Sequence, residues 1–460
     1  MALSLTATAL ALAACTSGST STAAPRTPGT HAPATPASRT ASPRPATGPP
    51  DWPTYHGRND RAGDAAAGAL RPPLRRAWTR RLDGAVYAQP LVVGGLVIAA
   101  TENNTVYALD AAHGRIRWHR HLGAPVSAAH LPCGNIDPLG ITGTPAYDAT
   151  TADIFVVTET AGGRHTLVAL AASNGRPRWH RNLDVMSGRD PSAQQQRSAL
   201  LVAHGHVYVA FGGLYGDCGN YVGYITGVAT DGRGPTLRYA VPTAREAGMW
   251  AAAGPVTGPQ GDIYVATGNG AQTGGNYDGS DSVIRLTPQL HRVGFFAPTT
   301  WASDNAQDLD LGSAAPVPLR GHIVVAGKRG TVYLLPPRLG GIGGQVSTLS
   351  GCPAYGGAAS AGPQVFLPCS DGLRRLDVTG NRMRWRWSIP GLAGSPVLAG
   401  NVLYALDQNA GDLVMVVTQT GHVRARIQVG KVTRFATPVP FGTRVFVGTT
   451  SGVVAVRGRA

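Results

Sequence analysis

Charge is scarce in this sequence, and acidic charge is scarcest. Asp, Glu, Lys and Arg make up only 14% of the 460 residues, and 25 acidic residues stand against 40 Lys and Arg, so the formal net charge is +15. Gly and Pro are abundant instead, at 61 and 35 residues. Little charge combined with many turn-forming residues argues against long amphipathic helices and predicts an all-β protein.

The apolar run at the start, residues 1–14, is too short to span a bilayer as a permanent helix. It ends in Leu12-Ala13-Ala14-Cys15, which resembles the lipobox of bacterial lipoproteins. The resemblance implies cleavage before Cys15 and acylation of its sulfur. No Lys or Arg precedes the run, and a start codon assigned too far downstream would explain this departure. The alternative is an ordinary apolar N-terminus with a chance cysteine.

Residues 16–50 contain no acidic side chain and consist almost wholly of Ser, Thr, Ala, Pro and Gly. Such a segment cannot bury enough apolar area to offset the entropy of ordering it. We therefore expect a disordered tether between a lipid anchor and a folded part that begins at residue 51. The expected location is the extracytoplasmic face of a bacterial cell membrane.

Metal-binding cysteine patterns are absent as well. The sequence has no Cys-x-x-Cys, which disfavours a zinc site, and no Cys-x-x-Cys-His, which excludes a covalently attached c-type haem. Four cysteines remain after Cys15, an even number that suits disulfides in an exported chain. Cys352 and Cys369 flank a short Gly-rich stretch and are expected to pair, which leaves Cys133 with Cys218. Metal ligation is the rival interpretation.

A repeat of about 40 residues runs through the chain from residue 88. Each unit has four short apolar or alternating segments separated by Gly, Asp and Asn turns. The units open near Pro90, Pro145, Ser198, Pro255, Pro316, Gly357, Pro396 and Pro438. A four-stranded antiparallel unit has two apolar faces and must stack on its neighbours, so the repeat predicts an eight-bladed β-propeller.

A Trp recurs in the fourth segment of the repeat at a fixed distance after a Leu. The pairs are Leu109 with Trp118, Leu170 with Trp179, and Leu376 with Trp385. A large ring at one place in each sheet suits packing between blades better than contact with a ligand.

The last unit has three segments, at 437–439, 445–447 and 453–456, and no fourth. Upstream of the first unit, residues 74–82 form a strand-like segment that contains Trp78 and has no unit of its own. We expect this N-terminal strand to pair with the 453–456 strand, which would close the ring and remove an exposed sheet edge.

Residues 108–118 follow the pattern A-x-D-x-x-x-G-x-x-x-W, which resembles the repeat of the pyrroloquinoline quinone (PQQ) propellers, the quinoprotein dehydrogenase-like superfamily. Residues 51–57 (DWPTYHG) are similar to the segment before the first blade in many bacterial members. The resemblance covers residues 51–460 and implies the propeller fold. It leaves function open, because the superfamily includes polyvinyl-alcohol-dehydrogenase-like enzymes as well as inert outer-membrane assembly lipoproteins.

The family's dehydrogenases hold PQQ over a calcium ion, with Glu and Asn as metal ligands, an Asp base, and a Lys or Arg at the quinone oxygens. By this resemblance Asn269 would bind calcium and cofactor, and Lys328 would bind the cofactor. Asp308 or Asp310 would be the catalytic base, and Asp217 is the nearest candidate for the acidic metal ligand. Oxygen ligands suit calcium, and a desolvated Asp could take an alcohol proton.

Two departures weigh against this assignment. The third unit has no Gly-Ala-Glu motif, and Cys133 is followed by Gly134, so the adjacent-cysteine disulfide of many members is missing. Asn269 and Lys328 also lie in Gly-bounded turns, where both residue types are common without a ligand. The insertion at residues 133–142 either shapes a binding surface or is decoration held by its disulfide.

The sequence favours, by a small margin, a lipid-anchored binding or scaffold propeller at the cell envelope. The alternative is a PQQ- and calcium-dependent dehydrogenase that oxidises an alcohol or a sugar. The arginine excess favours contact with anionic lipid or an anionic wall polymer, and a cell-envelope protein is the other candidate partner. We expect a monomer, and no nucleic-acid recognition motif is present.

Overall fold

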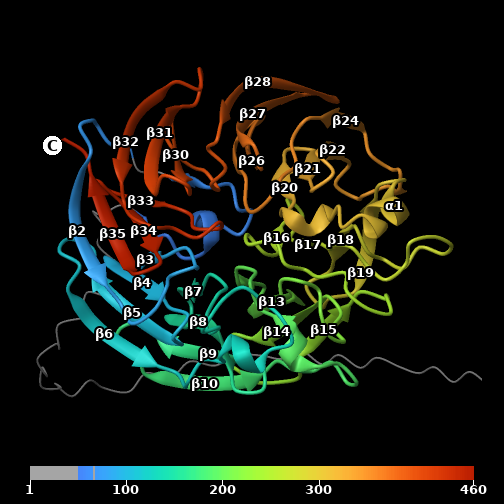
Figure 1. Ribbon diagram of the computed structural model, residues 1–460, viewed down its shortest axis with the longest axis horizontal. Helices are drawn as coiled ribbons and strands as arrows, with labels where there is room; N and C mark the ends of the chain where they lie inside the picture. The colour runs from blue at the N-terminus through green and yellow to red at the C-terminus, as the bar shows by residue number, and fades with distance from the viewer. Residues whose placement is uncertain (1–49, 66–67, 460) are drawn as a thin grey trace, which may run out of the picture. The chain divides into compact units, whose positions relative to one another are not determined.

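The computed structural model describes residues 50–65 and 68–459, and these form a ring of eight β-sheets (Figure 1). The eight-bladed propeller predicted from the repeat is confirmed. The predicted signal peptide, Cys15 and most of the tether lie outside the described residues, so lipid attachment stays a prediction. No helix in the described part of the chain is both long enough and apolar enough to cross a membrane.

The first four blades follow chain order. Blade 1 contains β3 (Leu91–Val93), β4 (Leu96–Ala100), β5 (Thr105–Asp110) and β6 (Ile116–His121). Blade 2 contains β7 (Ala146–Asp148), β8 (Asp153–Thr160), β9 (Arg164–Ala171) and β10 (Pro177–Asn182). Blade 3 contains β12 (Leu201–Ala203), β13 (His206–Gly213), β14 (Tyr224–Ala229) and β15 (Leu237–Ala240). Blade 4 contains β16 (Val256–Thr257), β17 (Ile263–Ala266), β18 (Val283–Leu286) and β19 (Arg292–Ala297).

The other four blades complete the ring. Blade 5 contains β20 (Val317–Leu319), β21 (His322–Ala326), β22 (Thr331–Leu335) and β24 (Ser347–Ser350). Blade 6 contains β25 (Ala359–Ala361), β26 (Gln364–Cys369), β27 (Gly372–Thr379) and β28 (Arg382–Pro390). Blade 7 contains β29 (Val397–Ala399), β30 (Val402–Asp407), β31 (Asp412–Val417) and β32 (Val423–Gln428). Blade 8 contains β33 (Val439–Phe441), β34 (Arg444–Thr449), β35 (Gly452–Arg457) and β2 (Arg75–Arg81).

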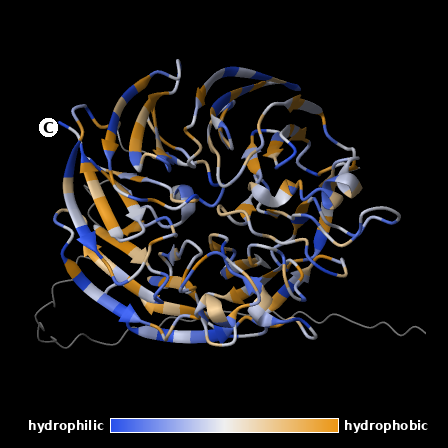
Figure 2. Ribbon diagram, in the orientation of Figure 1, coloured by the Kyte–Doolittle hydropathy of each residue, from blue (hydrophilic) through white to orange (hydrophobic). Residues whose placement is uncertain are grey.

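Three short strands and five short helices lie outside this scheme. The strands β1 (Asp64–Ala65), β11 (Gln194–Gln195) and β23 (Gly341–Ile342) each extend one blade to five strands. The helical turns are η1 (Tyr55–Gly57), η2 (Ala128–His130), η3 (Pro191–Ala193), α1 (Trp301–Ala306) and η4 (Leu311–Ser313). Figure 2 shows the resulting pattern, with mainly hydrophobic inner strands and outer strands banded in hydrophilic and near-neutral residues.

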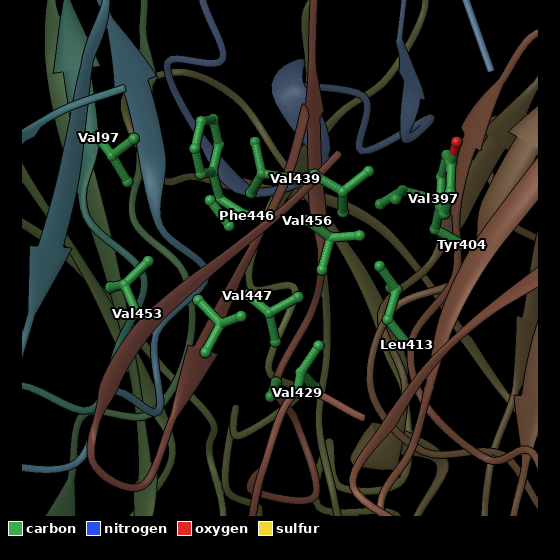
Figure 3. Close-up of a cluster of buried hydrophobic side chains, with 14 of the residues drawn as sticks. Val97, Val397, Tyr404, Leu413, Val429, Val439, Phe446, Val447, Val453 and Val456 are labelled. Carbon is green, nitrogen blue, oxygen red and sulfur yellow. The ribbon is translucent and has the colours of Figure 1, made fainter. Parts of the chain in front are cut away.

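The ring closes as predicted. β2 pairs antiparallel with β35, and Trp78 lies opposite Ala455. Figure 3 shows the core on both sides of this blade, where Val97 of blade 1 and Val397 of blade 7 flank Phe446 of β34. The N-terminal strand therefore gives the last blade its fourth strand and covers the edge of β35.

Tryptophans on the outer strands of four blades pack against the next blade, as the recurring Trp predicted. Each ring lies over a glycine in the turn between the third and fourth strands of the following blade, and its Nε1 donates to a backbone carbonyl there. The pairs are Trp78 with Gly114, Trp118 with Gly175, Trp179 with Gly232, and Trp387 with Gly421. Only a residue without a side chain leaves room for the indole ring at this distance.

In blade 6 the predicted Trp385 also packs between blades, but on the side of blade 5, and a second tryptophan takes the position over the glycine. Trp387, not Trp385, lies over the glycine of the next blade. β27 and β28 pair with an irregular register in which Arg375 lies opposite Trp387 and Leu376 opposite Trp385. Because of this bulge the two tryptophans point to opposite faces of the sheet, and Trp385 packs against the blade 5 side. The extended hairpin of blade 6 moves the equivalent Trp two residues along the chain.

Residues 51–65 fill the ring from within, and η1 appears as the blue turn near its centre in Figure 1. Arg61 is buried and donates to the carbonyls of Tyr55 and Leu200. Burial lowers the pKa of the Arg61 guanidinium to about 9 and that of the His56 imidazole to about 3. Tyr55 reaches across to the hydroxyl of Thr437 at 3.2 Å. The segment before the first blade therefore packs inside the channel that the blades enclose.

Both predicted disulfides are present. Cys133 pairs with Cys218 and Cys352 pairs with Cys369. The first bridge joins residues 126–143, between blades 1 and 2, to residues 212–224 of blade 3, around a small cluster of apolar residues that includes Ile136. The insertion at residues 133–142 is thus held against the third blade.

A methyl group at a tryptophan-packed glycine should destabilise the ring. A Cβ at Gly175 would lie 2.5 Å from a ring carbon of Trp118. We expect Gly175→Ala to cost about 1–3 kcal/mol more than Gly400→Ala in chemical denaturation. Both glycines have positive φ, at 66° and 60°, but nothing lies within 4 Å of the Cβ position at Gly400. Equal losses in the two variants would contradict this packing role.

Candidate ligand site on the propeller axis

The predicted site residues lie at one end of the ring. Neighbouring strands in a blade run antiparallel, so the turns between second and third strands share an end with the connections into the next blade. Asn269 and Lys328 lie in such turns, and Asp310 lies in such a connection. We call this end, which also carries Glu102, Trp250 and Phe435, the connection face.

Three aromatic rings meet at the centre of the connection face. Trp250 precedes blade 4 and Phe435 precedes blade 8, which are opposite positions in a ring of eight. Their ring centres are nevertheless 6.4 Å apart, and Tyr355, which precedes blade 6, lies 6.4 Å from Trp250. Residues from opposite sides of a ring can meet only near its axis, so this aromatic cluster marks the axis.

Three cations surround the aromatic cluster. The Nζ of Lys328 lies 5.6 Å from the centre of the Trp250 ring. The guanidinium carbon of Arg434 lies 4.1 Å from the Tyr355 ring centre, and that of Arg197 lies 5.5 Å from the Phe435 ring centre. Aromatic faces attract such cations. Among the described residues, Arg197 and Arg434 form no salt bridge with a carboxylate, so these two guanidinium groups make the axis attractive to anions.

Asp310 and Lys328 form a close ion pair beside Trp250. Lys328 Nζ lies 2.5 Å from Asp310 Oδ2 and 2.6 Å from Asp308 Oδ1. Burial raises the pKa of the Asp310 carboxyl to about 6, although Lys328 opposes the rise. Burial disfavours the charged Lys328, but the carboxylates of Asp310 and Asp308 outweigh this and raise its pKa. Asp310 is buried, whereas the Asp308 side chain is 62% exposed.

Backbone contacts fix the position of Asp310. Its Oδ1 accepts a hydrogen bond from the backbone N–H of Asn269 at 2.6 Å. A Cβ at Gly268 would lie 2.1 Å from that oxygen, so the Thr-Gly-Asn-Gly turn needs its glycine for this contact. The carboxylate of Asp281 accepts a hydrogen bond from the backbone N–H of Leu311, next to Asp310, and so fixes the connection between β19 and β20. The sequence motifs thus bring Asn269, Asp310 and Lys328 together.

The carboxylate beside the Asn269 side chain is Glu246. Asn269 Nδ2 donates to Glu246 Oε2 at 3.5 Å. Asp217, the candidate acidic ligand from the sequence, accepts instead from the hydroxyl of Tyr221, and its backbone carbonyl accepts from Arg245. Arg245 in turn pairs with Glu246, so Asp217 reaches Asn269 only through two intervening residues.

Glu246 and Asn269 fit part of a calcium site. Oxygen ligands lie about 2.3–2.6 Å from calcium, so two of them on one ion can be separated by the 3.5 Å found here once the Asn269 amide turns its oxygen inward. In residues 50–65 and 68–459, no group of three His, Cys, Asp or Glu side chains is arranged to hold a metal. The two residues match the Glu and Asn of the family's ligand set, and a bound cofactor and water would have to supply the remaining ligands.

A buried carboxyl group lies on the same face near Arg197. Glu102 is 2% exposed, and its Oε2 accepts from the backbone N–H of Gly140 and the hydroxyl of Thr142. Burial raises the pKa of Glu102 to about 8, and these two donors and the charge of Arg197 only partly oppose the shift. Gly140 belongs to the disulfide-held insertion, so this loop is anchored to the first blade through Glu102.

Sequence reasoning missed Trp250, Tyr355, Phe435, Arg197, Arg434 and Glu246. Each stands alone in a connection, with no repeat or motif around it. Their position just before the first strand of a blade was the available signal, because those connections converge on the axis of a propeller.

Comparison with known proteins gives the same architecture. Residues 74–221 match the family described as outer membrane protein assembly factor BamB. A polyvinylalcohol dehydrogenase from Pseudomonas sp is 26% identical over 311 residues, which are 58% of this chain and 45% of that protein. The chain therefore spans about half the length of this curated relative.

Two solved structures share the fold. A quinohemoprotein alcohol dehydrogenase from Comamonas testosteroni has a TM-score of 0.71 at 18% identity, over 89% of this chain and 81% of that one. BamB from Moraxella catarrhalis has a TM-score of 0.60 at 17% identity, over 84% of this chain and 100% of that one. The resemblance to the PQQ-type propellers is confirmed. At these identities the structural likeness shows the fold alone, and the relatives include both enzyme and assembly factor.

The buried Glu102 should make stability depend on pH. An unfolded Glu ionises near its ordinary pKa of 4.5, whereas Glu102 in the fold keeps its proton to about pH 8. The contribution of Glu102 to the free energy of unfolding is therefore fully present below about pH 4.5. It is lost as the pH rises through about 8. We expect the melting temperature of Glu102→Gln to fall less over this range than that of the wild type.

Asp412→Asn, which removes a carboxyl at the start of β31, controls for the loss of one acidic group. If the melting temperatures of Glu102→Gln and the wild type fall equally between pH 4.5 and pH 8, the raised pKa of Glu102 is contradicted.

Proposed function

We propose that this chain is an extracytoplasmic binding propeller whose connection face takes a planar aromatic ligand with several negative charges. The observation that carries the proposal is the meeting of three aromatic rings and three cations on the axis. Trp250 offers a flat surface, and Arg197 and Arg434 offer positive charge beside it. Lys328 shares its charge with Asp310 and Asp308 and offers an N–H donor. A ligand that stacks and carries carboxylates would use both features.

PQQ has this chemistry, since it is a planar ring system that bears three carboxylates and a quinone. The relatives support the same choice, because a polyvinylalcohol dehydrogenase and a quinohemoprotein alcohol dehydrogenase are among them. Lys328 would lie beside the quinone oxygens, and Glu246 with Asn269 would hold a calcium ion. The arginines would pair with the carboxylates.

An extracytoplasmic location is supported by the two disulfides, which persist in oxidising compartments. The match of residues 74–221 to the BamB family agrees with it. Attachment to a membrane through Cys15 is part of the proposal.

A specific observation favours a second candidate, the oxidation of an alcohol. Asp310 is buried, has its pKa raised to about 6, and lies between Asn269 and Lys328. Its carboxylate could accept the hydroxyl proton of a bound alcohol, while Lys328 holds the carboxylate in place. PQQ, when bound, supplies the acceptor for the hydride. The closely packed aromatic rings would exclude water from one side of the site.

Titration of the purified chain with PQQ and calcium tests the proposal. We expect the wild type to bind with micromolar affinity. Binding can be measured by the quenching of tryptophan fluorescence, because Trp250 would stack on the ligand. Lys328→Met and Trp250→Leu should each weaken binding at least tenfold, equal to about 1.4 kcal/mol. Lys431→Met is the matched control, because it removes the other lysine of the chain and should bind as the wild type does.

Absence of binding at high PQQ concentration, or equal losses in Lys328→Met and Lys431→Met, would reject the ligand assignment. Dye-linked alcohol oxidation that disappears in Asp310→Asn, while PQQ binding remains, would establish the second candidate. Binding without oxidation would reject the dehydrogenase and leave the binding function.

A further inference from the structure

Four arginines surround a pocket at the outer edge of blade 8, away from the connection face. The pocket has a volume of about 440 Å³ and is lined by Arg75, Arg444, Arg457 and Arg459, together with Pro73, Thr443 and Gly458. It lies where β2 begins and β35 ends, near the C label in Figure 1. No acidic side chain lines it.

Strand register places three of these arginines side by side. Arg75 on β2 lies opposite Arg457 on β35, and Arg457 lies opposite Arg444 on β34. Residues opposite each other on neighbouring strands point to the same face of the sheet. Three positive charges therefore form a row across three adjacent strands, and like charges in this arrangement repel one another and destabilise the sheet. Arg459 adds a fourth charge two residues beyond Arg457.

No carboxylate in residues 50–65 or 68–459 pairs with Arg75, Arg444, Arg457 or Arg459. The rest of the sequence, residues 1–49, 66–67 and 460, contains no Asp or Glu. Arg444 donates one hydrogen bond, from Nη2 to the carbonyl of Ala112. Its buried Nε has no hydrogen-bond partner in the described structure. Within the described residues, the row thus presents to the pocket guanidinium donors that no carboxylate side chain uses.

We propose that this pocket, the arginine pocket, binds a phosphate ester. Guanidinium groups match phosphate oxygens with paired N–H donors, and a phosphate between Arg457 and its neighbours would remove the repulsion within the row. The volume exceeds that of one phosphate group and is within the range of small-molecule sites, so the ester portion also has room. The ester can be a free molecule or the headgroup of a lipid, because both present the same chemistry.

Calorimetry with the full chain and glycerol 3-phosphate at low salt tests the arginine pocket. Binding should weaken at least tenfold in Arg444→Gln/Arg457→Gln. The control Arg382→Gln/Arg384→Gln removes two exposed arginines from β28 on blade 6 and should bind within twofold of the wild type. Equal weakening in both variants would show a general charge effect and overturn the proposal.

Vesicles distinguish the two sources of the ester. Cosedimentation with phosphatidylglycerol vesicles but not phosphatidylcholine vesicles, lost in Arg444→Gln/Arg457→Gln, assigns the pocket to a lipid headgroup. Binding of glycerol 3-phosphate without vesicle binding assigns it to a free ester. Failure to bind either probe overturns the proposal.

Thermal stability gives a second readout, which also tests the repulsion within the row. In buffer free of phosphate, Arg457→Gln should melt at a higher temperature than the wild type, because the middle charge of the row is gone. Added glycerol 3-phosphate should raise the melting temperature of the wild type and not that of Arg457→Gln. A lower melting temperature for Arg457→Gln in phosphate-free buffer would contradict the repulsion on which the proposal rests.

Discussion

The packing of a tryptophan over a glycine of the next blade is the contact on which the ring depends. A single blade has two apolar faces and cannot persist alone, so the ring is stable only if each blade docks on its neighbours. At four junctions an outer-strand indole lies where a Cβ would otherwise be, as Trp118 does over Gly175. Trp78 makes the same contact from the N-terminal strand, so ring closure uses the interaction that joins the other blades.

Closure brings distant parts of the sequence together on the axis. Trp250 and Phe435 are on opposite sides of the ring and are separated by almost half the chain, yet they contact each other. The N-terminal segment fills the channel, and Tyr55 packs in the same core as Ala251, next to Trp250. A change in the number or tilt of the blades would separate these residues, because the three rings come from connections before three different blades. The binding surface is a property of the closed ring.

The repeat made the blades predictable, since each strand is encoded by local alternation and by the turn that follows it. The closing strand could be predicted for the same reason. The disulfides followed from the even number of cysteines and the short spacing of Cys352 and Cys369. Prediction failed where geometry between segments decides the outcome. The longer hairpin of β27 and β28 gave the position over the next blade's glycine to Trp387, and no motif around Glu246 marks its place beside Asn269. Asn269, Asp310 and Lys328 were found only because their surrounding motifs resemble a family, whereas Trp250 has no such motif.

The central claim is that the axis of the connection face is a binding site for a planar polyanion. A crystal structure of the chain grown with PQQ and calcium tests it most directly. The account predicts ligand density stacked on Trp250, with carboxylates within hydrogen-bonding distance of Arg197 and Arg434 and the quinone beside Lys328. Density at any other place, or an axis that holds only water at saturating PQQ, would contradict the claim.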